Sequence, residues 1–194
     1  MELAPGTTHK DELNSRVYFS IKTGHILSNM HSGALMYWGI PFRSAEHAYQ
    51  WAKCKWLGRT ETARQVSEAE TPFLAKTYAR TRLTRQEKKA WRNSPIHLQA
   101  MYSVLLCRYH SEEMFRKVLE TFSNCYFCED THDKYWGIGC SQSVANALSI
   151  EQVPGENVLG RLLMLLARTK GEIIPGNDWE EFCFNLDYDV LRIM

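Results

Sequence analysis

Three polar side chains in the segment 44–58 have the types and spacing of a catalytic group. Glu46, Gln50 and Lys53 stand at positions i, i+4 and i+7, which places them on one stripe of a helix. A carboxylate can act as a general acid or base, and a lysine can hold a phosphate or attack a sugar C1′. Exposed Glu–Lys stripes are common on helices. This segment is unusually rich in Tyr and Trp for an exposed helix, which favours a functional stripe.

A second candidate group lies in the loop-like segment 133–140, which reads DKYWGIGC. Gly137 and Gly139 allow the backbone to approach a ligand closely, and Trp136 offers a stacking face for a base. Asp133 could stabilise the positive charge that builds on a ribose as its N-glycosidic bond breaks. A glycine turn with one buried Trp is the alternative interpretation, and the pattern alone leaves both open.

Three further features could belong to a binding site. Ser28 and Asn29 form a polar pair that could contact a ribose or base edge, or simply cap a turn. Trp91 could stack on a substrate or fill the space between helices. The basic run 80–92 is the best candidate for a phosphate or nucleic-acid patch, although a solvated helix face explains most such runs.

The six cysteines favour free thiols over a disulfide framework. Cys125 and Cys128, with His132 and Cys140 nearby, could supply four zinc ligands on paper. Only one close ligand pair exists, and cysteine also packs in strands as a small apolar residue, so no metal site is predicted. We find no signal peptide and no run of about 18 apolar residues. A cytoplasmic protein without a membrane span is therefore expected.

Composition indicates an ordinary globular protein. The chain has 194 residues, of which 44% are hydrophobic and 23% charged, and this length fits one domain. The net charge of +1 provides no general attraction to nucleic acid or to an anionic membrane. Any contact with nucleic acid must therefore be local.

Periodicity predicts a mainly α fold with a small β element, an α+β class. Short strands are expected at 17–21, 34–40 and 126–128, and the first two are expected to share a sheet. Helices are expected at 45–57, 60–69, 72–80, 84–93, 95–110, 111–122 and 158–169. Neither strand–helix alternation nor a glycine-rich phosphate loop is present. We expect a flexible leader (1–16), one compact domain (17–170), and a C-terminal extension (171–194) docked on it.

Taken together and in order, these motifs resemble the NADAR family of YbiA-like N-glycosidases. The resemblance runs from about Val17 to Arg168, most of the chain. The matching stretches are Leu27–Asn29, Phe42–Lys53, Thr71–Pro72 with Ala75–Lys76, Trp91, Asp133–Gly139 and Gly155–Met164. Each stretch alone is weak, and their ordered co-occurrence is specific.

The resemblance implies a compact, mainly helical fold and hydrolysis of a ribose C1′–N bond without metal or cofactor. Carried over by position, the expected catalytic residues are Glu46, Lys53 and Asp133. The expected substrate-binding residues are Ser28, Asn29, Gln50, Trp91, Trp136, Gly137 and Gly139. The ribose is expected to lie between the Glu46 helix and the Asp133 loop.

The resemblance implies two substrate classes. The first is ADP-ribose attached to guanine bases of nucleic acid, and the second is phosphorylated ribosylamino-pyrimidine intermediates of riboflavin synthesis. A non-catalytic module that binds ADP-ribose or a related nucleotide is the alternative from another class. The chain departs from the family pattern at Met30 and Ala48, where an aromatic residue is frequent. These departures bear on substrate choice more than on reaction type.

Overall fold

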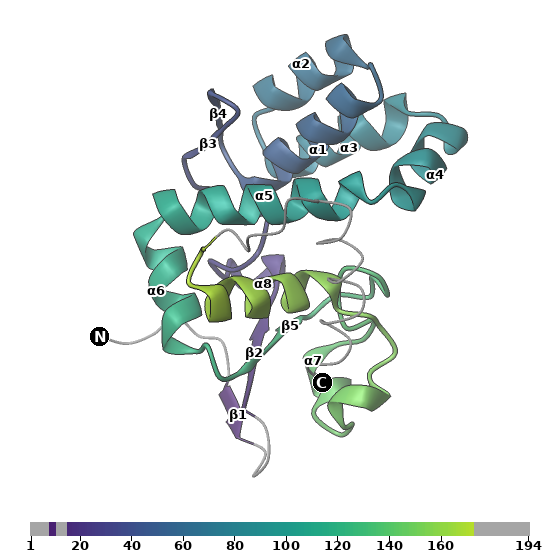
Figure 1. Ribbon diagram of the computed structural model, residues 1–194. Coiled ribbons are helices and arrows are strands. Elements are labelled where there is room, and N and C mark those ends of the chain that lie inside the picture. Colours follow the sequence, from purple (N-terminus) through teal and green to yellow (C-terminus); the bar gives the residue numbers. More distant parts are fainter. Residues whose placement is uncertain (1–7, 11–14, 173–194) are drawn as a thin grey trace. The chain divides into compact units, whose positions relative to one another are not determined.

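The computed structural model describes residues 8–10 and 15–172, which divide into two compact units (Figure 1). The first unit contains the residues up to Ser28 and those from Met114 to Glu172, and the second runs from Asn29 to Glu113. The chain therefore starts the first unit, builds the second, and returns to complete the first. Helices predominate and the sheets are small, which confirms the expected α+β class.

A three-stranded sheet organises the first unit. Its strands are β1 (Thr8–Lys10), β2 (Ser15–Phe19) and β5 (Tyr126–Glu129), in the order β1-β2-β5. β2 pairs antiparallel with β1 and parallel with β5, with Val17 opposite Phe127. A parallel pair needs a crossover connection, and here that connection contains the whole second unit.

The sheet corrects the prediction of a flexible leader over 1–16. Residues 8–10 form β1, and residues 15 and 16 begin β2, because the two strands supply each other's backbone partners. The predicted docked extension lies, from residue 173 onward, outside the described residues.

Helix α8 (Val158–Thr169) packs on β5 in the first unit. Leu159, Leu162, Leu163 and Leu166 recur at i, i+3, i+4 and i+7 and are buried, so they form its apolar face. The unit also contains α6 (Glu113–Thr121), α7 (Gln142–Ala145) and two 3₁₀ turns, η1 (Ile21–Thr23) and η2 (Ile150–Gln152).

The second unit begins with a β-hairpin made of β3 (Leu35–Tyr37) and β4 (Ile40–Phe42). Its two-residue turn has positive φ at both Trp38 (53°) and Gly39 (73°), as a type I′ turn requires. The expectation that the 17–21 and 34–40 strands share a sheet is wrong. The glycine turn folds the second run back on itself, so β3 pairs with β4 and β2 pairs elsewhere.

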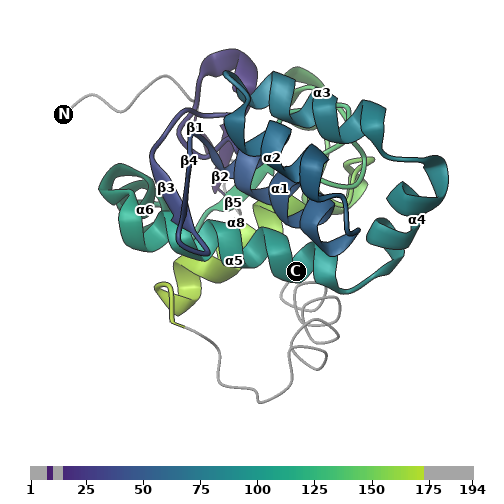
Figure 2. The ribbon, with the colours of Figure 1, turned by 90° about the horizontal axis from the view of Figure 1, so that it is seen from above.

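Five helices complete the second unit: α1 (Ala45–Trp56), α2 (Thr60–Glu68), α3 (Pro72–Arg82), α4 (Arg85–Asn93) and α5 (Ile96–Ser111). Helix α1 is central, because it contacts α2, α3 and α5 (Figure 2). The Ser44 side chain caps α1 by accepting the His47 N–H, and Thr84 and Glu87 form a capping box at the start of α4. The amphipathic spacing of α5 predicts four core positions, and all four are buried: Leu98, Met101, Leu105 and Tyr109.

The helical spacing of Ala45, Ala48, Tyr49 and Trp56 predicts a buried face of α1. Ala45, Ala48 and Tyr49 are buried, whereas Trp56 is 45% exposed in the last turn. Glu46 and Gln50 are only 6% exposed each. The predicted polar stripe of α1 is therefore covered by protein over most of its length.

Candidate active site

The polar stripe of α1 is a continuous hydrogen-bonded chain. Gln50 Nε2 donates to Glu46 Oε1 at 2.8 Å, and Lys53 Nζ donates to Gln50 Oε1 at 3.0 Å. The amide can face only one way in this chain, because its NH₂ must meet the carboxylate and its oxygen must meet the ammonium. An exposed surface stripe would not bury its carboxylate, so the interpretation as a solvated Glu–Lys stripe does not apply here.

Two contacts fix the start of α1, where Glu46 lies. Ser44 Oγ lies 2.7 Å from His47 Nδ1, and His47 Nε2 lies 3.1 Å from the Ala69 carbonyl oxygen. His47 is completely buried, and this burial lowers its pKa. His47 therefore positions the first turn, in agreement with the structural role that its place at the N-terminus suggests.

Lys53 occupies an environment that lowers its pKa. Burial lowers its pKa, and the charges of Lys88 and Lys76 lower it further, against an opposing contribution from Glu46. Lys76, on α3, also reaches the carboxylate, with its Nζ 3.9 Å from Glu46 Oε1. A lysine with a lowered pKa is a better nucleophile near neutral pH than an exposed one.

Asn29 provides a buried acceptor beside this group. Its carbonyl oxygen accepts the Glu46 N–H at 2.9 Å, so its backbone adjoins the first turn of α1. Its side-chain Nδ2 lies 3.2 Å from Met101 Sδ, while Oδ1 is buried and has no hydrogen-bond partner among the described residues. Buried polar atoms are normally paired, so this oxygen is a candidate to meet a donor on a ligand.

The neighbouring Ser28 belongs to the first unit and is 2% exposed, with its N–H donating to the His25 carbonyl oxygen. It therefore participates in a local turn, as one of its two predicted interpretations requires.

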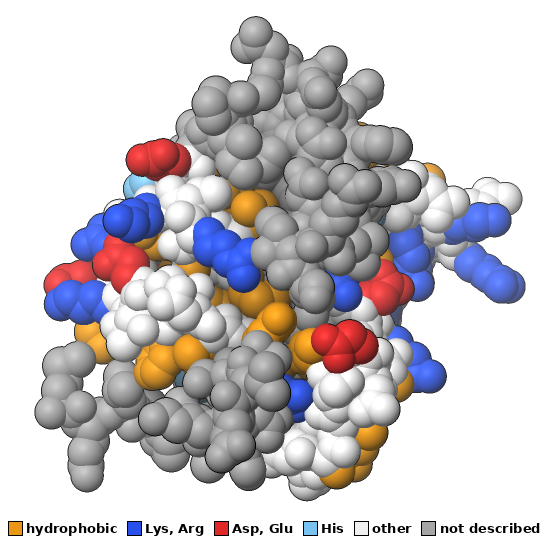
Figure 3. All heavy atoms as spheres, turned by 60° about the horizontal axis from the view of Figure 1, so that its bottom comes forward, with side chains coloured by type: hydrophobic (Ala, Val, Ile, Leu, Met, Phe, Trp, Pro, Cys, Tyr) orange, Lys and Arg blue, Asp and Glu red, His pale blue; other side chains and the backbone are white. Residues whose placement is uncertain are grey.

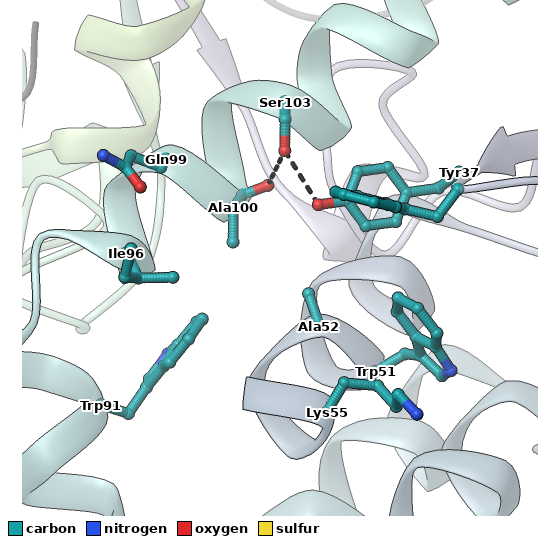
Figure 4. A pocket seen from close by; sticks show the side chains of 10 residues that line it. Tyr37, Trp51, Ala52, Lys55, Trp91, Ile96, Gln99, Ala100 and Ser103 are labelled. Atoms are coloured by element: carbon teal, nitrogen blue, oxygen red, sulfur yellow. Dashed lines mark hydrogen bonds between the residues drawn. The ribbon is translucent and has the colours of Figure 1, made fainter. Parts of the chain in front are cut away.

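Trp91 lies in the wall of a pocket within the second unit. The pocket has a volume of about 550 Å³ and a mostly apolar lining (Figure 4). Trp91 Nε1 donates to the Tyr49 hydroxyl at 3.0 Å, and its ring packs against Trp56 with centroids 5.6 Å apart. Opposite it lie Tyr37 and Trp51, whose rings meet edge to face.

This pocket and the Glu46–Lys53 stripe use different sides of α1. The α1 residues that line the pocket are Trp51, Ala52 and Lys55. At about 100° per residue they point roughly half a turn away from the mean direction of the stripe. Trp91 thus borders the pocket, and the structure separates it from Gln50 and Glu46, with which it was expected to form one binding site.

The Asp133 loop belongs to the first unit and has a clear structural role. Asp133 is exposed, and its Oδ1 accepts the N–H groups of Tyr135 (2.9 Å) and Trp136 (3.0 Å). One carboxylate oxygen therefore holds the loop, as in an Asx turn. Among the described residues we find no hydrogen bond to Oδ2, which leaves that oxygen for chemistry.

The same loop caps α8. The N–H groups of Asn157, Val158 and Leu159 donate to the carbonyls of Gly137, Tyr135 and Trp136 at 3.0 Å each. These N–H groups have no partner inside the helix, so the loop satisfies them.

Packing explains the loop glycines. A Cβ on Gly137 would collide with Thr131, and Gly139 has a φ of +72° and lies against Gly155. Both glycines therefore have a structural explanation, and their predicted substrate contact stays a prediction.

The comparisons with known proteins concern the family and the fold. A family model, described as the NADAR domain, matches residues 11–169, which is most of the chain and spans both units. This chain belongs to the NADAR family. The NMR structure of the Escherichia coli protein YbiA matches with a TM-score of 0.56 and 22% identity. It covers 84% of this chain and 91% of YbiA, which supports a YbiA-like fold. The search of curated proteins returned no match.

Two features of this NADAR domain escaped the sequence interpretation. Lys76 was noted within a matching stretch, but its ion pair with Glu46 was not expected, because α1 and α3 are brought together only by folding. Asn157 was also missed as a positioning residue. Its side chain accepts the Glu129 N–H and donates to the Phe127 carbonyl, and so ties the start of α8 to β5.

Two predicted absences concern metal and membrane. Among residues 8–10 and 15–172, no group of three or more His, Cys, Asp or Glu side chains could hold a metal ion. Within the same ranges, no helix has the length and apolarity needed to span a membrane.

Proposed function

We propose that this NADAR domain is an N-glycosidase that removes ADP-ribose from guanine bases in nucleic acid. The observation that carries this proposal is the buried chain of Glu46, Gln50 and Lys53, with Lys76 at its edge. It combines an acid–base group, an amine with a lowered pKa and one further cation, Lys76, suited to phosphate. The ligand needs all three kinds of partner, because it contains a C1′–N bond and a diphosphate.

Glu46 is the proposed proton donor to the leaving base. Breaking the C1′–N bond leaves an electron pair on the base nitrogen and positive charge on the sugar. A protonated Glu46 neutralises that nitrogen, and its conjugate carboxylate then stabilises the cationic sugar. Gln50 orients the carboxyl group by donating to its Oε1.

Lys53 is the proposed nucleophile. Its neutral amine forms a bond to C1′ as the C1′–N bond to guanine breaks, and guanine departs with the proton from Glu46. The attached amine gives a proton to Glu46. The ribose ring then opens as C1′–O4′ breaks and O4′ takes that proton, which leaves a Schiff base between C1′ and Lys53. Water adds to C1′ and loses a proton to Glu46, and the C1′–lysine bond breaks to release ADP-ribose and free Lys53. These steps use only groups of the chain and water. Asp133 stays a predicted stabiliser of the cationic sugar.

The test compares two substrates side by side: an ADP-ribosylated guanine oligonucleotide and a phosphorylated ribosylamino-pyrimidine. We expect release of ADP-ribose from the first. Turnover of the second alone would replace the proposed substrate with the riboflavin-pathway class. Tight ADP-ribose binding with no release from either would identify a binding module instead of an enzyme.

The covalent step has its own test in borohydride trapping during turnover. We expect a reduced sugar adduct on the peptide that contains Lys53 and none in Lys53→Arg. A near-normal rate in Lys53→Arg would exclude capture by that lysine. Glu46→Gln should lower kcat roughly 10²-fold or more, as for positioned acid–base groups. Glu61→Gln is the matched control, because Glu61 also accepts from a glutamine four residues later but is exposed.

A further inference from the structure

The charge of this chain is concentrated in one short stretch. Residues 76–92 contain seven Lys or Arg and one Glu, a net charge of +6, whereas the whole chain carries only +1. Its single carboxylate, Glu87, pairs with Arg59 and closes the capping box of α4. The stretch therefore presents cations to solvent with little internal neutralisation.

Helical geometry sorts these cations into rows. On α4, Arg85, Lys88, Lys89 and Arg92 stand at i, i+3, i+4 and i+7, so they share one face, while Trp91 lies to one side of it and is buried. Like charges at these spacings repel and destabilise a helix. A bound polyanion would remove that repulsion.

Helix α3 has a similar row. Phe73, Lys76 and Arg80 stand at i, i+3 and i+7 and are exposed, while Ala75 and Ala79 on the other side are buried. In Figure 3, Lys and Arg side chains project from the right-hand edge of the face shown, and others lie at its left-hand edge beside Asp and Glu.

The two rows meet at the candidate active site. Lys76 pairs with Glu46, and both Lys76 and Lys88 lie close enough to Lys53 for their charges to act on it. Exposed aromatic rings accompany the cations: Phe73 is 56% exposed and precedes Lys76 by one turn. Trp56 is 45% exposed and packs against Trp91 of α4.

We propose that the exposed faces of α3 and α4, with Phe73 and Trp56, bind a single-stranded polynucleotide and lead it to the Glu46–Lys53 group. This inference rests on the proposed function. The combination of a cationic track with aromatic side chains is the one that holds single strands, because phosphates meet the cations and unpaired bases stack on the rings. A membrane surface would use the cations but would not need rings beside a catalytic group.

The test measures binding of an unmodified, fluorescently labelled single strand of about 15 nucleotides, a length near the site size of single-strand binders. Binding is followed by anisotropy at several salt concentrations. The variant Arg85→Gln with Lys89→Gln removes two charges from the exposed α4 face and keeps good helix formers. The control, Lys22→Gln with Arg168→Gln, removes two exposed charges from the first unit.

We expect the α4 variant to bind about 10- to 30-fold more weakly than the wild type at roughly 0.1 M salt. The slope of log binding constant against log salt concentration should be smaller in magnitude by about 1.4. Phe73→Ala should weaken binding about tenfold through lost stacking. The control should bind like the wild type. The α4 variant should also lose kcat/KM on an ADP-ribosylated oligonucleotide but keep it on ADP-ribosylated guanosine.

Binding reports on the surface, and hydrolysis reports on the proposed function. An α4 variant that binds the strand as tightly as the wild type overturns this inference, whatever the enzyme hydrolyses. If the α4 variant loses as much affinity for anionic vesicles as it loses for the strand, the inference is overturned in favour of a lipid surface. Strand binding through α4 with no hydrolysis of either substrate supports the surface and refutes the glycosidase.

Discussion

Replacing Gln50 by leucine isolates the link that joins the carboxylate to the amine. The side chain is buried, and its amide donates to Glu46 Oε1 at 2.8 Å and accepts from Lys53 Nζ at 3.0 Å. Leucine preserves much of the volume and removes both bonds. A buried hydrogen bond to a charged group contributes about 1.5–3 kcal/mol to stability. Its loss leaves Glu46 Oε1 without the donor that Gln50 provides.

The loss should appear in stability, in rate, or divided between them. In stability, 1.5–3 kcal/mol corresponds to a fall in Tm of roughly 3–12 °C for a chain of this size. In the transition state, the same energy corresponds to a rate reduction of about 10- to 150-fold. Thermal unfolding and single-turnover hydrolysis of the ADP-ribosylated oligonucleotide measure the two parts.

The chain contains a matched control for Gln50→Leu. Gln65 donates to Glu61 Oε1 at 2.9 Å across the same four-residue spacing, but on the exposed surface of α2. Gln65→Leu should change stability by only about 0.2–0.5 kcal/mol and leave the rate unchanged. If Gln50→Leu and Gln65→Leu have equal, small effects on both Tm and rate, the buried chain does not support catalysis and the reasoning is refuted.

Three other predictions concern the loop, the helix contact and pH. Asp133→Asn keeps the Oδ1 acceptor, so it should keep the wild-type Tm while lowering kcat roughly 10²-fold. Asp133→Ala removes the acceptor and should also lower the free energy of unfolding in urea by about 0.5–2 kcal/mol. If Asp133→Asn has the same kcat as the wild type, Asp133 has no catalytic role. Gly160→Ala should lower the free energy of unfolding in urea by about 1–3 kcal/mol or more, because the new Cβ would collide with the Phe127 carbonyl oxygen. An unchanged unfolding midpoint would contradict this close approach. If neutral Lys53 is the nucleophile, kcat/KM should rise with pH through a pKa below 10.5. Lys88→Gln removes a charge that lowers the Lys53 pKa, so it should move that rise to higher pH. If kcat/KM falls over the same pH range, Lys53 acts as a cation instead.

Local signals in the sequence predicted the helices well, because their causes are local. Ser44 and Thr84 cap the helices that follow them, and Pro72 begins α3 at a position that tolerates proline. Strand partners could not be predicted in the same way. β2 pairs with β5 more than 100 residues later, and no local feature of Val17–Phe19 specifies that partner.

The candidate site shows the same division between local and distant causes. The spacing of Glu46, Gln50 and Lys53 gave their common stripe, because helix geometry fixes it. Their burial, and the approach of Lys76 from α3, depend on tertiary packing. The separation of Trp91 from the stripe has the same origin, because its ring direction is set by Tyr49 and Trp56.

The two departures from the family pattern, Ala48 and Met30, lie in different surroundings. Ala48 is fully buried in a cluster with Leu35, Phe42 and Val104, on the side of α1 that faces the apolar pocket. A larger residue there would alter packing on the side of α1 opposite Glu46. Met30 instead follows Asn29, whose carbonyl accepts the Glu46 N–H. Of the two departures, Met30 is therefore the one that adjoins the first turn of α1, where Glu46 lies.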